Sequence, residues 1–494
     1  MPSSPRRHID LPVTLDRDAP APLATQLGDT LRTAMRDGTL KHGERLPSSR
    51  GLARQLGVSR TVVTEAFQQL YAEGWLEGRH GSGTYVAGLG DVPPAGPAPN
   101  GDAAPAPAPG RPPLIELRPG HPWVHDYDDA AWRRAWRRAA DLPPADDPDP
   151  YGLPRLREAL AVHLRRARGM PVEPADVLVT RGAGNGLDLV AATLLRPGDL
   201  AGVEDPGYRV ARNVFAARGA RVVPCPVDDD GVIVERLPDD LRVLYTTPAH
   251  QYPLGGRLPI PRRERLLAWA RRTGATIIED DYDAEFRYDV APLPALYGLD
   301  PARVVLLGTL SKSLTPDVGV GWLVAEPELL AAVARTRDDL ADRTCGPAQA
   351  AVATLLERGD LERHLRRMRL EYARRRAAVV DALRGVTPLR GDTAGLHVVV
   401  ELPGPAVPRI VAAAEERGVA LDTLARFHQG VARVHGLVIG YGSASPADLR
   451  RAMEVVAELI AAETDAAETD AAETGGGTAA GVAVRSATAE GSSA

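Results

Sequence analysis

Residues 304–316 read VVLLGTLSKSLTP, an apolar run followed by a polar turn that carries Lys312. The run predicts a buried strand, so Lys312 lies just beyond the carboxyl end of a strand, where open α/β sheets bind ligands. The chain contains 59 lysines and arginines, but Lys41 and Lys312 are its only lysines. An amine can form a Schiff base and a guanidinium cannot, so a lysine kept at this place indicates covalent chemistry.

Hydroxyl groups surround this lysine. Thr309, Ser311 and Ser313 lie within three residues of Lys312 and offer hydrogen-bond donors of the kind that a phosphate requires. A strand-end lysine beside such donors is the arrangement expected for pyridoxal phosphate held on a lysine.

A second strand end supplies a carboxylate and a phenol. The apolar strand at residues 276–279 is followed by Asp280, Asp281 and Tyr282. Because side chains alternate along a strand, Asp280 and Tyr282 share one face and Asp281 points the other way. A carboxylate opposite the pyridinium nitrogen keeps it protonated, and a tyrosine hydroxyl can hydrogen-bond the phenolic oxygen of the ring. Asp280 and Tyr282 fit these two roles.

A glycine-rich turn upstream offers a phosphate site. Residues 181–186 read RGAGNG between a predicted strand and a predicted helix, so free backbone N–H groups and the helix dipole can hold a phosphate dianion. A dinucleotide-binding fold is the rival interpretation, but the internal position and G-x-G-x-G spacing lack the full βαβ fingerprint. Tyr208, in EDPGY after the next strand, is placed to stack on the pyridine ring.

Apolar strands alternate with helical patterns over the middle of the chain, which predicts a large α/β domain with a mostly parallel sheet. The expected strands are residues 177–180, 200–203, 243–246, 276–279, 304–307 and 321–324. After about Leu361, a long arginine-rich helix, strands at 397–401 and 437–441 and a closing helix predict a smaller C-terminal α+β lobe.

Biased segments mark the domain boundaries. Residues 88–113 are rich in Pro, Ala and Gly and predict a linker, and residues 463–494 repeat a short acidic unit and predict a disordered tail. We therefore expect a first domain at residues 1–87 and a larger one at residues 114–462.

The overall composition excludes several classes of protein. With 44% hydrophobic and 25% charged residues the chain is ordinary globular material, and Cys225 and Cys345 make neither a disulfide framework nor a zinc site. No stretch reaches about 18 consecutive apolar residues, so we expect a soluble, cytoplasmic protein without a structural metal. A net charge of -6 argues against a general nucleic-acid coat but leaves room for a local basic face.

The first ninety residues have the pattern of a winged helix-turn-helix. Apolar residues repeat with helical spacing at 23–35 and 63–70, and a short helix at 49–56 precedes a tight turn at Gly57. Ser59 can cap the next helix, which leaves Arg60, Thr61 and Thr64 on the outward face of a helix suited to the major groove. Strands at 75–77 and 84–86, joined by a glycine-rich hairpin, form a wing. Between residues 41 and 60, lysine and arginine face only one carboxylate, which suits phosphate contacts.

Residues 45–86, RLPSSRGLARQLGVSRTVVTEAFQQLYAEGWLEGRHGSGTYV, resemble the GntR family of winged-helix regulators. The resemblance implies an operator in double-stranded DNA, contacted by Arg45, Ser48, Arg50, Ser59, Arg60, Thr61 and Thr64, with Gly81 and Gly83 shaping the wing. The alternative is a three-helix module with a solvated basic face and no DNA partner.

Residues 117–459 resemble fold-type I aminotransferases, which are pyridoxal-phosphate-dependent transferases, through YGLPRLREAL, EDPGY, TTPAHQYPLGG, EDDYDAEFRY and GTLSKSL. With the winged helix, the chain resembles the MocR subfamily of GntR regulators. The resemblance implies that Lys312 is the catalytic residue that carries the cofactor, with Asp280 at the ring nitrogen, Tyr282 at the ring oxygen and Tyr208 stacked on the ring. It further implies a phosphate site made of Ala183, Gly184, Asn185, Thr309 and Ser311. The resemblance also implies a head-to-tail homodimer and a regulator in which an effector, often an amino acid or the vitamin itself, rearranges the aminotransferase-like domain and so changes DNA binding or transcription.

The sequence departs from the family pattern around the cofactor phosphate. Gly319 stands seven residues after Lys312, where the family usually has an arginine that anchors the phosphate. The acidic pair Asp146 and Asp147 replaces a glycine-tyrosine pair that delivers a contact across the dimer.

A third departure concerns the substrate carboxylate, which aminotransferases hold with a C-terminal arginine. Leu437 and Val438 stand in that neighbourhood, and Arg433 and His435 lie near it only in a different register. Three functions are compatible with the sequence: a regulator that senses an effector through a pyridoxal phosphate domain, an aminotransferase with turnover that also binds DNA, and a cofactor-free protein that keeps the fold. The missing arginines favour a sensor over sustained turnover.

Overall fold

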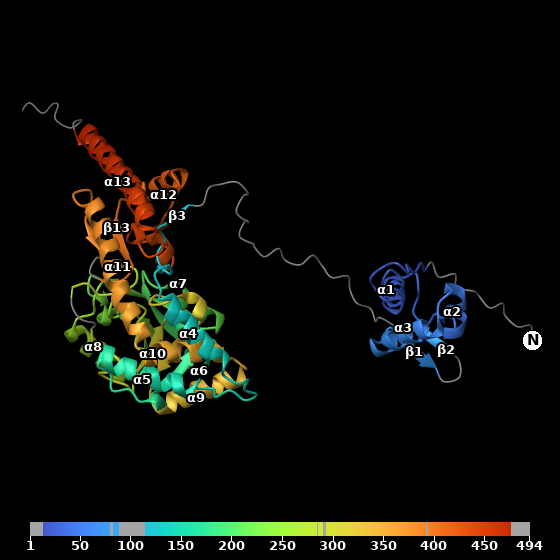
Figure 1. The fold of residues 1–494 in the computed structure, drawn as a ribbon. Helices are drawn as coiled ribbons and strands as arrows, with labels where there is room; N and C mark the ends of the chain where they lie inside the picture. Colours follow the sequence, from blue (N-terminus) through green and yellow to red (C-terminus); the bar gives the residue numbers. More distant parts are fainter. Residues whose placement is uncertain are drawn as a thin grey trace, which may run out of the picture. The chain divides into compact units, whose positions relative to one another are not determined.

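The computed structural model describes residues 13–79, 83–87, 114–283, 285–289, 293–391 and 394–475. The chain divides into two compact units, Met1–Pro109 and Gly110–Ala494 (Figure 1). The linker expected at residues 88–113 lies outside the described residues.

Three helices and a two-stranded sheet make up the first unit: α1 (Leu23–Arg36), α2 (Ser49–Leu56), α3 (Arg60–Ala72), β1 (Leu76–Arg79) and β2 (Gly83–Val86). The apolar faces of the helices meet in one core that buries Leu31, Leu52 and Phe67. Gly57 adopts a left-handed φ of 64° and ends α2, so that the chain turns sharply before α3 begins at Arg60. The helix-turn-helix and the two wing strands are confirmed.

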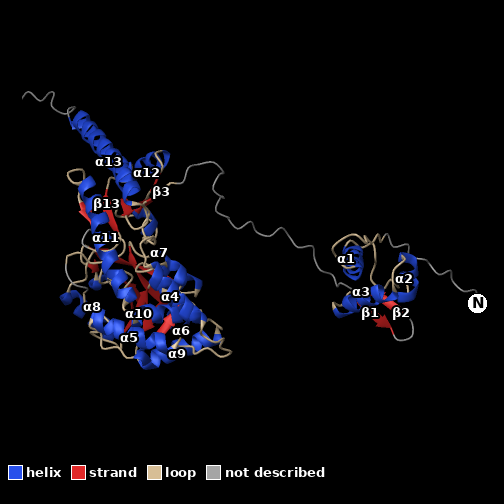
Figure 2. Cartoon of the chain, viewed as in Figure 1, coloured by secondary structure: helices blue, strands red, loops and turns tan. Residues whose placement is uncertain are grey.

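A sheet runs through the second unit with helices around it (Figure 2). It has eight strands in the order β4-β11-β10-β9-β8-β5-β6-β7. Its strands are β4 (Val177–Thr180), β5 (Leu200–Asp205), β6 (Arg221–Asp228), β7 (Gly231–Val232), β8 (Leu241–Thr246), β9 (Thr276–Asp280), β10 (Val304–Thr309) and β11 (Gly321–Val324). The strands from β10 to β6 pair in parallel, whereas β11 is antiparallel to both of its neighbours and β7 is antiparallel to β6. The mostly parallel sheet and its six expected strands are confirmed.

The sequence pattern does not predict β6 and β7. Pro224 and Pro226 interrupt β6, and a proline cannot donate to a strand ladder. In the structure β6 tolerates them because it lies near the sheet edge, where only the two-residue β7 covers its outer side.

Both faces of the large sheet are buried. Along β10, Val304 and Leu306 belong to one core, and Val305 and Leu307 belong to the other. The first core also receives side chains from α4 (Asp129–Ala140), α5 (Pro154–Arg168), α8 (Ile260–Thr273) and α10 (Gly346–Glu357), and the second from α6 (Ala183–Leu194), α7 (Arg209–Ala217) and α9 (Pro327–Asp339). Burial on both faces explains why these strands are continuous apolar runs.

A smaller lobe follows at the C-terminal end. It contains α11 (Asp360–Leu383), α12 (Ala406–Glu416), α13 (Pro446–Gly475) and a four-stranded sheet in the order β12 (Leu389–Arg390), β13 (His397–Glu401), β16 (Gly436–Gly440) and β15 (Asp422–Thr423). The strand β3 (Ile115–Glu116) pairs in parallel with β14 (Val419–Ala420), so the start of the second unit joins this lobe. Short 3-10 helices occupy Pro174–Asp176, Val234–Arg236, Pro316–Val318 and Leu424–Phe427. The expected α+β lobe is confirmed.

The last helix, α13, extends beyond the boundary at which we expect the disordered tail. It continues past Glu463, which pairs with Arg409 of α12, and ends at Gly475. Alanine and glutamate have high helix propensity, and the acidic repeat contains no glycine before this point, so the repeat continues a helix whose first half is packed. Residues 476–494 lie outside the described part of the chain. Within the described ranges, no helix is long and apolar enough to cross a membrane.

A glycine in β10 allows close packing of two strands beneath the candidate site. A Cβ atom at Gly308 would lie 2.2 Å from the indole ring of Trp322 on β11. We therefore expect Gly308→Ala to lower the free energy of unfolding by about 3 kcal/mol, because the ring is buried and cannot move freely. Urea denaturation measures this change. Gly298→Ala, whose Cβ would lie 3.5 Å from the nearest atom, is the matched control and changes stability by less than about 0.5 kcal/mol. Equal effects of the two substitutions would contradict this account.

Candidate functional site

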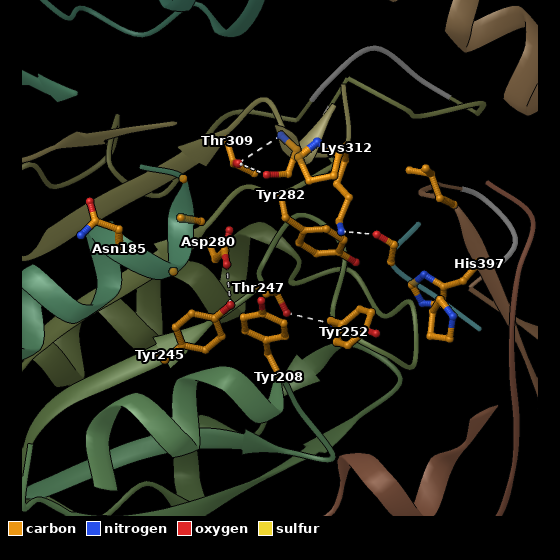
Figure 3. Close-up of a pocket in the computed structure, with 18 of the residues that line it drawn as sticks. Asn185, Tyr208, Tyr245, Thr247, Tyr252, Asp280, Tyr282, Thr309, Lys312 and His397 are labelled. Carbon is orange, nitrogen blue, oxygen red and sulfur yellow. Dashed lines mark hydrogen bonds between the residues drawn. The ribbon is translucent and has the colours of Figure 1, made fainter. Parts of the chain in front are cut away.

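A cavity of about 380 Å³ lies at the carboxyl ends of the parallel strands (Figure 3). Asp280 ends β9, Thr309 ends β10, and Thr247 directly follows β8. All nine residues expected to bind the cofactor line this cavity: Lys312, Asp280, Tyr282, Tyr208, Ala183, Gly184, Asn185, Thr309 and Ser311. The structure therefore brings the expected residues together, while their roles toward a cofactor stay predictions.

Lys312 lies in the turn that follows β10. Its Nζ donates a hydrogen bond to the carbonyl oxygen of Gly120. Burial lowers the pKa of the Lys312 amine, although the nearby carboxylates of Asp280 and Asp283 oppose that shift. A lower pKa increases the fraction of neutral amine, which is the form that attacks an aldehyde.

Asp280 presents a carboxyl group that is only half satisfied. Its Oδ2 accepts a hydrogen bond of 2.5 Å from the hydroxyl of Tyr245, and its Oδ1 is buried with no partner among the described residues. Burial raises the pKa of the Asp280 carboxyl to about 7. Asp281 faces the other side of the strand, as alternation predicts, and pairs with Arg168 at 2.7 Å. An unpaired buried carboxylate oxygen needs a cationic N–H partner, which a protonated ring nitrogen provides.

Tyr282 is held by a histidine and a carboxylate. Its hydroxyl lies 3.0 Å from His250 Nδ1 and 3.3 Å from the carbonyl oxygen of His250. His250 Nδ1 in turn lies 2.7 Å from Asp283 Oδ2. Burial, reinforced by the charge of Asp283, raises the pKa of the Tyr282 phenol well above its usual value. The phenol therefore keeps its proton and can donate it in a hydrogen bond.

The opposite end of the cavity is rich in hydrogen-bond donors. Gly182 adopts a φ of 98° and starts α6, whose first backbone N–H groups have no acceptor within the helix. The hydroxyl of Thr309 donates to that of Ser311 at 2.9 Å. A Cβ atom at Gly182 would lie 3.7 Å from Thr309 Oγ1 and 3.9 Å from Ser311 Oγ, so the hydroxyls and the helix start face each other. Such a cradle suits a phosphate dianion.

Several residues of the cavity wall were not identified from the sequence. The ring of Tyr208 stacks on that of Tyr245, with centroids 6.0 Å apart and planes at 23°, and meets the edge of Tyr252 (Figure 3). His397, the first residue of β13, brings the smaller lobe to the cavity. Tyr245 could have been identified from its position near the end of β8. Nothing in the local sequence indicates that β13 contributes a residue to the cavity.

None of the residues at the three departures from the family pattern belongs to the described lining of the cavity, and Asp146 and Asp147 are exposed. Gly319 adopts a left-handed φ of 57° and does not belong to the described lining of the cavity. Val438 is buried in an apolar cluster with Leu254 and Phe427. Arg433, which the sequence offered in another register, pairs with Asp205 at 3.3 Å instead.

The first unit presents the expected basic face. Arg45, Arg50, Arg60 and Thr61 are exposed, and Thr64 is half-buried with its hydroxyl donating to the Arg60 carbonyl oxygen at 2.9 Å. None of these arginines has a carboxylate partner within the described residues. The guanidinium groups are therefore available to phosphate or base edges.

Two serines expected at the DNA also have a structural task. Ser48 caps α2 by accepting from Gly51 N at 3.1 Å, and Ser59 caps α3 by accepting from Val62 N at 3.4 Å. Gly83 has a φ of 123°, and a Cβ atom there would lie 2.8 Å from Arg45 Nε, so the wing approaches Arg45 closely. Gly81 lies outside the described residues.

Two family models match the chain. Residues 23–86 match the bacterial regulatory proteins of the gntR family, and residues 126–456 match aminotransferase class I and II. The chain is 39% identical over 455 residues to the HTH-type pyridoxine biosynthesis transcriptional regulator PdxR of Corynebacterium glutamicum, covering 92% of this chain and 99% of that protein. It is 34% identical over 472 residues to the probable rhizopine catabolism regulatory protein MocR of Rhizobium meliloti, covering 89% and 94%.

Solved aminotransferase structures share the second unit's fold. An archaeal alanine:glyoxylate aminotransferase superposes with a TM-score of 0.66 at 27% identity, covering 70% of this chain and 90% of that one. The multiple substrate aminotransferase of Thermococcus profundus gives a TM-score of 0.65 at 26% identity, covering 71% and 92%. The expected aminotransferase fold is confirmed.

The raised pKa of Asp280 has a consequence for stability. Between about pH 4 and pH 7 the unfolded chain loses a proton that the folded, cofactor-free protein keeps, so stability falls as pH rises through this window. Between about pH 5 and pH 7.5, we expect the free energy of unfolding of Asp280→Asn to fall by on the order of 2 kcal/mol less than that of the unchanged protein. Urea unfolding of the cofactor-free protein at the two pH values measures it. Identical pH dependence in the variant and the unchanged protein would refute the assignment.

Proposed function

Because the chain belongs to the MocR-type GntR regulators, which join a winged helix-turn-helix to an aminotransferase class I and II domain, we propose that it is a DNA-binding regulator that holds pyridoxal phosphate on Lys312 and senses a small effector. The DNA-binding regulator follows from the family. The observation that carries the cofactor is the half-satisfied carboxyl group of Asp280, at the same cavity as Lys312, whose amine has a pKa lowered by burial.

The residues of the cavity suit the parts of pyridoxal phosphate. Lys312 would bind the aldehyde carbon, Asp280 would hold the proton on the ring nitrogen, and Tyr282 would donate to the ring oxygen. Tyr208 would stack on the ring, and the cradle at the start of α6 would hold the phosphate. When bound, the cofactor would supply an aldehyde group that condenses with amines and a ring that withdraws electrons.

The residues around the cavity favour the sensing of an effector over catalytic turnover. Val438 lies in an apolar cluster, and neither Val438 nor Arg433 belongs to the described lining of the cavity, so neither position offers a guanidinium group to a substrate carboxylate there. Binding an amine effector without efficient chemistry suits a protein whose output is transcription. We propose an amino acid or the vitamin itself as the effector, a homodimer as the working form, and the cytoplasm, where the operator DNA lies, as its location.

Lys312 can be tested against the other lysine of the chain. We expect the protein with added pyridoxal phosphate to show a visible absorbance. Reduction with borohydride should then leave a mass increase on the peptide that contains Lys312, because only an amine forms the imine. Lys312→Arg removes both signals, and Lys41→Arg, the matched control, keeps them. A protein that stays colourless with added cofactor would rule out the cofactor proposal and favour a cofactor-free sensor.

The DNA-binding face can be divided between base reading and phosphate contact. Arg60 starts α3 and is exposed, so Arg60→Ala should weaken binding to the operator by about 1–3 kcal/mol and relax its sequence preference. Lys41→Ala should weaken all DNA similarly and reduce the salt slope by about one unit. Fluorescence anisotropy with a fragment of the protein's own upstream region at several salt concentrations measures both. The placement of α3 in the groove is wrong if neither variant changes binding.

A further inference from the structure

The phosphate end of the cavity needs a cation that the usual position does not provide. Gly319 has no side chain and does not belong to the described cavity lining. Backbone N–H groups and two hydroxyls supply hydrogen bonds but no full positive charge, while a bound phosphate carries close to two negative charges. The structure must therefore place a cation elsewhere or tolerate an uncompensated dianion.

Arg181 is the one guanidinium among the described residues that line the cavity. It directly follows β4 and precedes Gly182, so it stands beside the first N–H groups of α6. Its backbone is fixed, because Arg181 N donates to Asn185 Oδ1 at 2.9 Å. Its side chain is 54% exposed and therefore free to change its partner.

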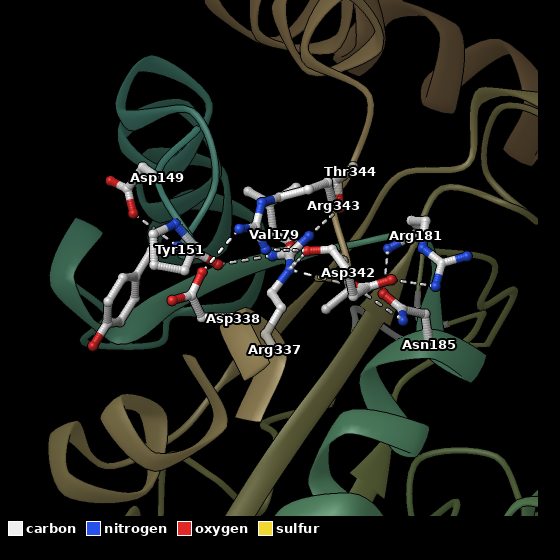
Figure 4. A network of polar contacts seen from close by, with 12 residues as sticks. Asp149, Tyr151, Val179, Arg181, Asn185, Arg337, Asp338, Asp342, Arg343 and Thr344 are labelled. Atoms are coloured by element: carbon white, nitrogen blue, oxygen red, sulfur yellow. Dashed lines mark hydrogen bonds and ion pairs between the residues drawn. The ribbon is translucent and has the colours of Figure 1, made fainter. Parts of the chain in front are cut away.

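The present partner of Arg181 is Asp342, on the connection between α9 and α10 (Figure 4). Asp342 is only 10% exposed and lies between two guanidinium groups, because Arg337 Nε approaches its other oxygen at 3.4 Å. Asn185 Nδ2 lies 3.5 Å from the same oxygen of Asp342. The carboxylate thus links the phosphate cradle to Arg337.

Arg337 is held in place by hydrogen bonds that do not involve Asp342. It is buried, with 2% of its side chain exposed, and its NH1 donates to the carbonyl oxygens of Val179 at 2.5 Å and Pro150 at 2.9 Å. Its NH2 donates to Thr344 Oγ1 at 2.6 Å. When Arg181 leaves, Asp342 therefore keeps a fixed cation, and no carboxylate is left buried without a counter-charge.

The charges of these three side chains do not cancel. Two guanidinium groups face one carboxylate, so Arg181, Arg337 and Asp342 together carry one positive charge next to the phosphate cradle. The Arg181–Asp342 pair is half-exposed, and ion pairs of this kind contribute little to stability. A phosphate dianion offers Arg181 a stronger, bidentate partner.

On the basis of the proposed function, we propose that Arg181 supplies the cation for the cofactor phosphate in place of the residue missing at position 319, and that Asp342, held by Arg337, stores it until the phosphate arrives. The side chain of Arg181 turns from Asp342 to the phosphate without a change in fold. Arg181 thereby makes the site select the phosphorylated vitamin over its unphosphorylated form.

The test compares two ligands that differ only in the phosphate. Titrations of pyridoxal phosphate and of pyridoxal into the full-length protein, followed by visible absorbance, give both dissociation constants. We expect Arg181→Gln to weaken pyridoxal phosphate about tenfold and leave pyridoxal within about twofold, because a charge-assisted contact to the phosphate is lost. Arg272→Gln is the matched control: Arg272 is 60% exposed, pairs with Asp239 at 2.6 Å and lies outside the cavity lining.

A second variant moves the affinity in the opposite direction. Asp342→Asn removes the competing charge and leaves Arg337 its contacts with Val179, Pro150 and Thr344, so pyridoxal phosphate should bind more tightly, by up to about tenfold. Inorganic phosphate should compete with pyridoxal phosphate less effectively in Arg181→Gln than in the unchanged protein.

The outcomes separate this inference from the proposed function. Equal loss of pyridoxal and pyridoxal phosphate in Arg181→Gln would mean a structural role and overturn the inference, as would unchanged binding of both. In either case the cofactor proposal would stand, because the unchanged protein would still form the absorbing complex. If the unchanged protein binds neither ligand, both proposals fail together.

Discussion

The second unit depends on one constraint: parallel strands end at the same edge of a sheet, so polar groups placed after them converge. β8, β9 and β10 pair in register, and this brings Tyr245, Asp280 and the turn of Lys312 to one cavity. Asp280 is buried and Lys312 is partly buried, and burial raises the pKa of the Asp280 carboxyl and lowers the pKa of the Lys312 amine. A ligand with a positive charge beside Asp280 would favour the charged form of that carboxyl group.

Neighbouring contacts stabilise the buried polar groups of the cavity. Tyr245 satisfies one oxygen of Asp280, and His250 and Asp283 hold the phenol of Tyr282 in place. The packing of Gly308 against Trp322 and the continuous apolar runs of the central strands supply the rigid support. The protein thus combines a stiff sheet with a polar edge whose hydrogen bonds are incomplete, and a ligand that completes them stabilises the folded state by its own binding free energy.

His397 of the smaller lobe and the ion pairs of Asp342 connect the cavity to other parts of the second unit. His397 reaches the cavity from β13, so a ligand there contacts both parts of the second unit. Asp342 connects Arg181, at the cavity, to Arg337, which binds the backbone of β4 through Val179. If Arg181 turns to a bound phosphate as we propose, the anion at the start of α6 alters the ion pairs of Asp342, which is held by Arg337 of α9. This is the kind of physical connection that a regulator needs between ligand and output.

The sequence by itself determined the two-part organisation and most of the site. Helical spacing and Gly57 predicted the helix-turn-helix, and apolar runs predicted six strands of the large sheet. Asp280, Lys312 and the turn at residues 181–186 were identified because each follows such a run directly. The strand β6 was not predicted because it contains two prolines. The helix α13 continues beyond its expected end because the acidic repeat has a high helix propensity. Only the tertiary structure decided that Gly120 accepts from Lys312 and that Arg181 pairs with Asp342, 161 residues away. Local periodicity reports which face a side chain takes, whereas contacts between distant loops depend on how the whole sheet and its helices pack.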